Sequence, residues 1–249
     1  MRFTFSAGTI LCLTFFATTI ATAQSPQYTS RVVVGWTLLV RNELLEQDSE
    51  RTEHAVRLLQ QQLEEIIRVV PKTAVTELQK VRLYFCPEYP GMGPRAEYHP
   101  SSGWLTANGR DPEMAKAVEF TNIRVFEEEL SRMPNFALHE LAHALHDRVL
   151  RLGFENPDIQ AAFDRAKSSG RYDNVERRLG NGRKPTRERA YAMTTPQEYF
   201  AECSEACFST NDFFPFNREQ LQQHDPEMLT LVLELWNVQP GAEKGVRNQ

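Results

Sequence analysis

The chain has 249 residues, a formal net charge of −5 and 41% hydrophobic residues. This length is enough for one domain with a substantial core, or for a small two-part catalytic unit. The mild acidity argues against nucleic acid as the main partner, because phosphate binding needs a basic face.

The first 23 residues have the pattern of a secretory signal peptide. Arg2 precedes a short apolar run over residues 10–20, and Ala21-Thr22-Ala23 then supplies the small residues of a cleavage site. The run is too short for a membrane span, and no later segment is apolar for long enough to be one. We therefore expect a bacterial exported protein, secreted or periplasmic. Its residues 24–249 would form a single monomeric domain with no stable membrane anchor after cleavage.

Three of the four cysteines, Cys86, Cys203 and Cys207, lie after the expected cleavage site. An odd number of cysteines in an exported chain leaves at least one thiol unpaired. The sequence allows two arrangements. Cys86 forms a disulfide with one of the other two, or all three are buried thiols that pack as small apolar side chains.

Patterns of apolar residues predict the elements of the first half of the chain. These are a buried strand over residues 31–40, a helix over 50–69, a short helix over 73–79 and a strand over 81–85. Residues 86–114 are rich in proline and glycine and indicate long structured loops. Residues 118–126 predict a further strand that runs into the next helix. This order of strands and helices favours an α+β lobe with a mixed sheet.

Residues 139–143, His-Glu-Leu-Ala-His, form an HExxH motif in a stretch with strong helical character. Two histidines four positions apart, His139 and His143, lie on one face of a helix, where both imidazoles can bind one zinc ion. Glu140 can then act as a general base on a water at the metal. Pro134 suits the first turn of this helix, and Ser131 is a candidate cap.

His146 lies on the same helix but is not expected to bind the same ion. Seven residues separate it from His139, which corresponds to about 10.5 Å along the helix axis. Zinc–nitrogen bonds are about 2 Å long, so one straight helix cannot bring His139, His143 and His146 to the same metal ion. His146 is expected in the core or behind the ligands, and the third ligand must come from elsewhere.

A second predicted helix, which begins near Pro196, carries three carboxylates on one face. Glu198, Glu202 and Glu205 follow i, i+4, i+7 spacing within a sequence rich in Ala, Cys and aromatic residues. This composition favours a buried helix, and buried carboxylates need a partner such as a metal. If Glu198 is the ligand, Glu202 lies one turn further along and is placed to accept the other ring N–H of a zinc-bound histidine.

Together the two motifs resemble the zinc peptidase domain of anthrax lethal factor and its relatives, in the gluzincin group of zincins. The resemblance rests on HExxH followed by Tyr191, six residues, Glu198, two aromatic residues, Ala201 and Glu202. It covers roughly residues 115–210. It implies an α+β, zincin-like fold with a small mixed sheet, the HExxH helix and a mostly helical C-terminal part. The resemblance does not extend to the toxin-delivery domains of that family.

The resemblance also implies roles for single residues. The Zn²⁺ ligands would be His139, His143 and Glu198. Glu140 would be the general base, and Tyr191 would donate a hydrogen bond to an oxyanion in the transition state. In zincins the strand nearest the metal commonly pairs with an extended substrate, and residues 118–126 are the candidate. The alternative is an internal strand with neighbours on both sides.

The chain would then divide into an α/β lobe over residues 24–150, with the HExxH helix, and a mainly helical lobe over 151–249, with the third ligand. Helices are predicted over residues 157–167 and 226–236. Between them a basic loop, residues 177–189, leads to Tyr191. This loop either grips an acidic or C-terminal group of a substrate or is a solvated flexible loop.

These patterns predict an exported zinc-dependent metallopeptidase, a metalloendopeptidase, that acts on a peptide or protein substrate. One alternative is a zinc hydrolase of non-peptide amides such as cell-wall material. Another is a non-catalytic, zinc-stabilised binding protein. Glu140 and Tyr191 argue against the latter, because a structural zinc site needs no general base and is usually closed by a fourth protein ligand.

Overall fold

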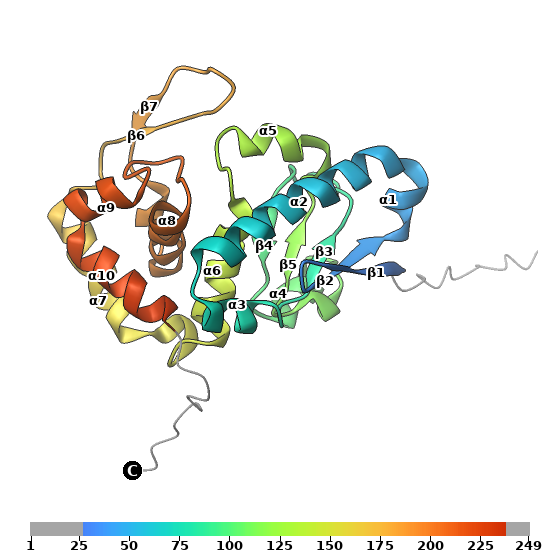
Figure 1. Cartoon of the computed structure of the whole chain (residues 1–249), viewed down its shortest axis with the longest axis horizontal. Coiled ribbons are helices and arrows are strands. Elements are labelled where there is room, and N and C mark those ends of the chain that lie inside the picture. The colour runs from blue at the N-terminus through green and yellow to red at the C-terminus, as the bar shows by residue number, and fades with distance from the viewer. Residues whose placement is uncertain (1–26, 238–249) are drawn as a thin grey trace, which may run out of the picture.

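The computed structural model describes residues 27–237, which form a lobe with a sheet followed by a mainly helical lobe (Figure 1). The fold class is α+β with a small mixed sheet, as expected. The expected signal peptide, residues 1–23, lies outside the described residues. Within residues 27–237, no helix combines the length and the apolar character that crossing a bilayer requires.

A five-stranded sheet in the order β1-β2-β3-β5-β4 organises the N-terminal lobe. Its strands are β1 (Tyr28–Val33), β2 (Trp36–Arg41), β3 (Leu83–Phe85), β4 (Ala96–Tyr98) and β5 (Val118–Phe120). β2, β3 and β5 run parallel, whereas β1 is antiparallel to β2 and β4 is antiparallel to β5. The sheet is therefore mixed, and β1 and β4 are its two edges.

The single strand predicted over residues 31–40 is wrong, because this segment contains the turn of the β1–β2 hairpin. Val34 and Gly35 form the turn and have φ values of 50° and 96°. The φ of Gly35 is one that residues with a side chain rarely adopt, which favours glycine there, and a Cβ atom would also displace the end of the Gln79 side chain. The sequence did not indicate this turn, because apolar residues continue on both sides of the single glycine.

The helices predicted over residues 50–69 and 73–79 are confirmed as α2 (Ser49–Val69) and α3 (Lys72–Leu78). A short helix that was not predicted, α1 (Asn42–Gln47), follows β2. α2 packs against α6 (Phe136–Arg148). Its buried apolar side chains are Ala55, Leu59, Leu63 and Ile66. The proline- and glycine-rich segment contains β4, α4 (Ser102–Ala107) and the 3₁₀ turn η1 (Pro112–Met114).

Residues 118–126 do not form one strand, which corrects the sequence prediction. β5 ends at Phe120, and the chain continues through the 3₁₀ turn η2 (Ile123–Val125) into α5 (Phe126–Leu130). Three consecutive glutamates occupy the first turn of α5, where the helix dipole favours acidic side chains. β5 also lies between β3 and β4 and is paired on both sides. It is therefore an internal strand, and β4 is the edge on this side of the sheet.

α6 carries the HExxH motif and is buried all round because it lies between the two lobes (Figure 1). Every residue from Phe136 to His146 is buried. The helix packs against β4, α2 and α3 of the N-terminal lobe and against α8 (Pro196–Phe208) of the C-terminal lobe. Polar side chains on such a helix need partners inside the protein.

Asn135, and not the expected Ser131, caps the N-terminus of α6. Its side-chain oxygen accepts a hydrogen bond from the Leu138 N–H at 3.0 Å, and its Nδ2 donates to the Gln62 carbonyl at 3.0 Å. Ser131 lies in the turn after α5, and its hydroxyl donates to the Glu128 carbonyl at 2.8 Å. Asn135 is fully buried, so it joins α6 to α2 away from water.

Asn135→Ala is expected to lower the free energy of unfolding by about 2–4 kcal/mol, measured by urea denaturation. The change removes a helix cap and the buried hydrogen bond that the Gln62 carbonyl accepts in addition to its bond within α2. Ser131→Ala is the matched control, because it removes a small polar side chain close by at an exposed position, and it should cost less than about 0.5 kcal/mol. Equal losses in the two variants would contradict the capping role of Asn135.

The C-terminal lobe is mainly helical. It contains α7 (Pro157–Ser169), α8, α9 (Arg218–His224) and α10 (Pro226–Trp236), with the 3₁₀ turn η3 (Gly153–Glu155) before α7. α7 and α10 confirm the helices predicted over residues 157–167 and 226–236. The predicted basic loop is largely a hairpin, in which β6 (Val175–Arg177) and β7 (Thr186–Glu188) pair antiparallel.

Cys86, Cys203 and Cys207 are free and buried. The arrangement with a disulfide is therefore wrong, and that with three buried thiols is confirmed. Burial raises the pKa of all three thiols, that of Cys207 to about 11. They stay protonated at neutral pH and pack as small apolar side chains.

Candidate metal centre

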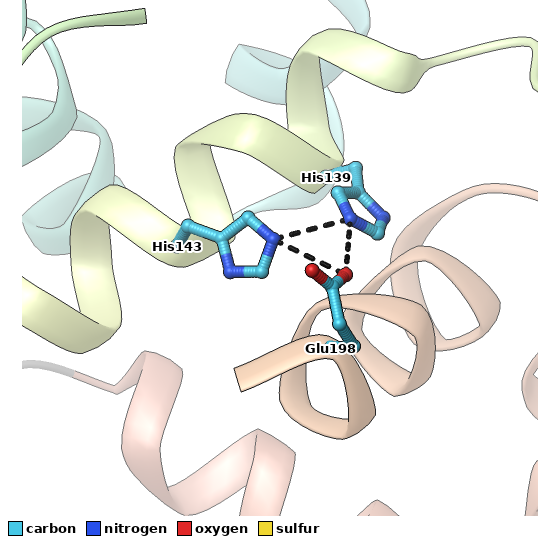
Figure 2. Close-up of side chains that lie close together, drawn as sticks. All are labelled: His139, His143 and Glu198. Carbon is cyan, nitrogen blue, oxygen red and sulfur yellow. Dashed lines mark hydrogen bonds and ion pairs between the residues drawn. The ribbon is translucent and has the colours of Figure 1, made fainter. Parts of the chain in front are cut away.

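α6 and α8 bring three ligand atoms of the predicted site together (Figure 2). Nε2 of His139 and Nε2 of His143 are 3.2 Å apart. Oε2 of Glu198 lies 3.1 Å from Nε2 of His139 and 3.4 Å from Nε2 of His143. Ligand atoms about 2.0–2.1 Å from a tetrahedral zinc are roughly 3.3 Å from one another. The triangle therefore has the dimensions of one face of a metal coordination shell.

Local sequence places the third ligand at the start of α8. Oγ1 of Thr195 accepts a hydrogen bond from the Glu198 N–H at 3.2 Å, and Pro196 occupies the first turn. The cap starts the helix three residues before Glu198, and α8 packs along α6. As a result, the Glu198 carboxylate lies opposite the two histidines.

The charges around the triangle favour a cation. Burial acts to lower the pKa of His139, but the charge of Glu205 and the contact with Glu198 outweigh burial and raise this pKa well above its usual value. Burial likewise acts to raise the pKa of Glu198, but the two histidines hold it well below its usual range. His139, His143 and Glu198 can therefore hold a metal ion.

The hydrogen-bond partner of His139 is Glu205 and not Glu202, which corrects the expectation from the sequence. Nδ1 of His139 is 2.8 Å from Oε2 of Glu205 but 3.9 Å from Oε1 of Glu202. Glu202 instead accepts a hydrogen bond from Nδ2 of Asn211 at 2.9 Å. The reason is the way the helices pack. The ring of His139 lies along the face of α8 with Nε2 toward Glu198, so Nδ1 points further along the helix to Glu205.

Glu140 is held by the edge of the sheet. Its Oε2 accepts a hydrogen bond from the backbone N–H of Tyr98 in β4 at 2.7 Å. The phenol of Tyr98 donates to Oδ2 of Asp147 at 2.6 Å, which ties β4 to the far end of α6. The edge strand thus orients the Glu140 carboxylate beside the metal-binding residues.

A cleft of about 600 Å³ opens over the three candidate metal ligands, and its walls include Glu140 and Tyr191. Tyr191 begins the 3₁₀ turn η4 (Tyr191–Met193) and is 47% exposed. Partial burial and the charge of Glu198 raise the pKa of its phenol to about 12. The hydroxyl is therefore protonated at neutral pH and can donate a hydrogen bond into the cleft.

His146 belongs to the core and not to the metal site. Its ring packs edge-on against Phe154 and Phe200, with centroids 5.1 and 5.3 Å away. Neither ring nitrogen has a hydrogen-bond partner among the described residues. Burial and the charge of His143 lower the pKa of His146 to about 4, so the ring is neutral near pH 7. The sequence expectation of a core position is confirmed.

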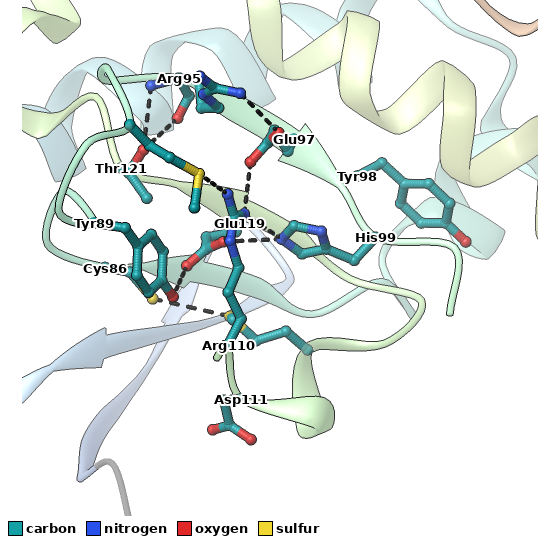
Figure 3. A network of polar contacts seen from close by, with 12 residues as sticks. Cys86, Tyr89, Arg95, Glu97, Tyr98, His99, Arg110, Asp111, Glu119 and Thr121 are labelled. Carbon is teal, nitrogen blue, oxygen red and sulfur yellow. Dashed lines mark hydrogen bonds and ion pairs between the residues drawn. The ribbon is translucent and has the colours of Figure 1, made fainter. Parts of the chain in front are cut away.

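A second group of residues of the types that bind metals lies along β4 and β5, and the positively charged side chain of Arg110 lies among them (Figure 3). Glu97, His99 and Glu119 are close enough to share an ion. However, Nη1 of Arg110 lies 2.6 Å from Oε2 of Glu97 and 2.9 Å from Oε2 of Glu119. Because Glu97 and Glu119 are directly opposite each other on the paired strands, they need this compensating charge. We interpret the group as a network that anchors β4.

Two further residues beside the site, Arg132 and Asp212, gave no signal in the sequence, and a third, Arg177, was expected only as part of the basic loop. Nη1 of Arg132, before α6, lies 2.7 Å from Oδ2 of the buried Asp212, after α8. Nε of Arg177 lies 3.3 Å from the same oxygen. These residues come from three separate segments, so no spacing links them. Glu205 differs, because the i, i+4, i+7 spacing already placed it on the ligand face.

Comparisons of the chain with protein-family models, curated proteins and solved structures find no match. Function is therefore inferred from the geometry of the cleft and the chemistry of its residues.

Proposed function

We propose that the protein is an exported zinc-dependent metallopeptidase with a zincin-like fold of the gluzincin type. The observation that carries the proposal is the His139–His143–Glu198 triangle, with a further carboxylate and a phenol in the same cleft. Two imidazoles and one carboxylate are a donor set that zinc prefers, and three protein ligands leave one coordination position open. An open position distinguishes a catalytic zinc site from a structural one.

Zinc at this site would supply Lewis-acid activation of a water and of the substrate carbonyl. Glu140 acts as the general base. The Tyr98 N–H holds one of its oxygens, and the carboxylate takes a proton from the water and passes it to the leaving amine. Tyr191 donates a hydrogen bond to the oxyanion that develops on the carbonyl.

The free edge of β4 favours a peptide as the substrate. The backbone groups of His99 form hydrogen bonds on the β5 side of the sheet. Its N–H donates to the Ala117 carbonyl at 3.0 Å, and its C=O accepts from the Lys116 N–H at 2.7 Å. The backbone groups of alternate residues, Ala96 and Tyr98, therefore point away from the sheet, and both residues line the cleft. Because Glu140 accepts the Tyr98 N–H, the groups left for pairing are the N–H and C=O of Ala96 and the C=O of Tyr98. An extended peptide can pair with such an edge. A non-peptide amide has no repeating backbone that could pair with this edge.

Metal analysis and chelator-sensitive cleavage test this proposal. The purified protein should contain about one zinc per chain, and a chelator should stop cleavage of an unfolded protein until zinc is restored. Cleavage of cell-wall fragments without cleavage of peptides would favour an amidase. Bound zinc without hydrolysis of either substrate would favour a binding protein.

Tyr191→Phe is expected to lower kcat by about 10²–10³-fold, with KM and zinc content nearly unchanged. The phenol contacts the oxyanion mainly in the transition state, so its removal affects the rate and not substrate binding. Tyr84→Phe is the control, because it removes a phenol that donates to the Glu113 carbonyl outside the cleft. If Tyr191→Phe leaves kcat within a few-fold of wild type, the phenol only packs. If it releases zinc, Tyr191 is a ligand.

A further inference from the structure

A second groove of about 510 Å³ continues the metal cleft beyond Tyr191. Arg177, Tyr191 and Phe213 line both cavities, so the two are adjacent. Three charged side chains line the second groove but not the metal cleft: Lys167, Glu188 and Arg189. With Arg177, the groove has three basic side chains and one acidic side chain.

Surrounding carboxylates compensate this positive charge only in part. No carboxylate among the described residues lies within ion-pair distance of Lys167, whose Nζ is 5.4 Å from the Phe163 ring centroid. Nε of Arg189 is 3.5 Å from Asp173, but both side chains are at least half exposed, and such pairs contribute little. The groove therefore keeps Lys167, which has no carboxylate partner among the described residues, and the weakly paired Arg189 next to the metal site.

The β6–β7 hairpin increases this charge and is fixed beside the cleft. Residues 175–190 contain six basic and two acidic side chains, in a chain whose net charge is negative. Figure 1 shows the hairpin extending from the C-terminal lobe toward α5. Gly180 in its turn has a φ of +67°, and a Cβ atom there would lie 2.3 Å from Oγ of Ser131. The hairpin thus contacts the N-terminal lobe and forms one end of the cleft.

Arg177 stands where the two cavities meet. Its guanidinium lies 4.6 Å from the Phe213 ring centroid, and its Nε is 3.3 Å from Oδ2 of Asp212. Its contact with Glu188 is long, at 3.6 Å, and its side chain is 31% exposed. Because a guanidinium has five N–H donors, Arg177 retains donors for another carboxylate.

We propose that this groove binds the carboxylate of an aspartate or glutamate side chain in the substrate. The peptidase would then prefer acidic residues on the Tyr191 side of the bond that it cleaves. This inference rests on the proposed function, because it takes a peptide to run from β4 past the metal into the groove. A nucleic acid fits less well, since the basic side chains line a concave extension of the cleft and not a broad face.

Peptide binding to the zinc-loaded Glu140→Gln protein tests the subsite without requiring cleavage. The probes are peptides in which one glutamine at a time is replaced by glutamate. At the position that reaches the groove, glutamate should lower Kd by about 3–10-fold. The double substitution Lys167→Gln/Arg189→Gln, added to this protein, should remove most of the difference, because Arg177 is then the one basic side chain left among the described residues that line the groove. Arg183→Gln/Lys184→Gln is the matched control, because it removes the same charge from hairpin residues that line neither cavity.

The outcomes test the proposed subsite and the proposed peptidase function separately. Equal affinity for the glutamate and glutamine peptides, or the same loss in both double variants, would overturn the subsite. Preferred binding of a DNA oligonucleotide, lost in the Lys167/Arg189 variant, would also overturn it. If acidic peptides bind as expected but the wild-type protein cleaves none, the subsite stands and the peptidase function fails. If the wild-type protein cleaves neutral and acidic peptides equally, and both bind equally, the function stands and the subsite fails.

Discussion

Glu140→Gln is expected to abolish nearly all peptidase activity while zinc content and stability stay near those of the wild type. Glutamine has the same shape, and its side-chain oxygen can still accept the hydrogen bond from the Tyr98 N–H. Its amide cannot take a proton from water. General bases typically contribute about 10²–10⁴-fold to a rate, so kcat should fall by at least about 10²-fold. The measurements are kcat on a cleaved peptide, zinc per chain and thermal unfolding.

A matched control separates this effect from a general loss of negative charge. Glu88→Gln makes the same chemical change at a surface pair, where Oε1 of Glu88 is 2.9 Å from Nε of Arg124. This variant should retain wild-type activity. If Glu140→Gln lost zinc together with activity, Glu140 would be part of the metal-binding structure, and its role as the base would be wrong.

Glu198→Ala is expected to lower zinc affinity more than any other single carboxylate substitution on α8. It removes one of the three ligand atoms and leaves only the two imidazoles of His139 and His143. Glu205→Gln should weaken binding by about 10–100-fold, because it removes the acceptor that orients His139. Competition with a chromophoric chelator measures the zinc affinities of these two variants and of a third, Glu202→Gln.

Glu202→Gln should have the smallest effect of the three. Its nearest oxygen to Nδ1 of His139 is 3.9 Å away, which is beyond hydrogen-bond distance. Burial and the neighbouring charge of Glu205 raise the pKa of Glu202, so a neutral amide is a mild replacement. A greater loss of zinc in Glu202→Gln than in Glu205→Gln would show that Glu202, and not Glu205, orients His139.

The sequence predicts the site best where one helix determines the geometry. Helical periodicity alone places His139 and His143 together, and it excludes His146 by distance along the axis. The periodicity also puts three carboxylates on one face of α8. The choice of Glu198 as the ligand came from the resemblance, and the structure places this carboxylate beside both histidines.

Features that depend on contacts between distant segments were not predictable in the same way. Whether Glu202 or Glu205 reaches His139 depends on how α6 and α8 pack, which no spacing within one helix reveals. β4 has only three residues in a stretch rich in proline and glycine, too few for an alternating pattern to mark it. It is held by the network around Arg110 and by Glu140, which come from other segments.

The unequal edges of the sheet have a consequence for self-association. Open strand edges are the places where folded chains pair with one another and aggregate. β4 exposes a short edge, and Glu140 already occupies the N–H of Tyr98. β1 is six residues long, and its Val32 is 77% exposed. Edge-to-edge aggregation would therefore begin at β1, on the opposite side of the sheet, and would leave the metal cleft accessible.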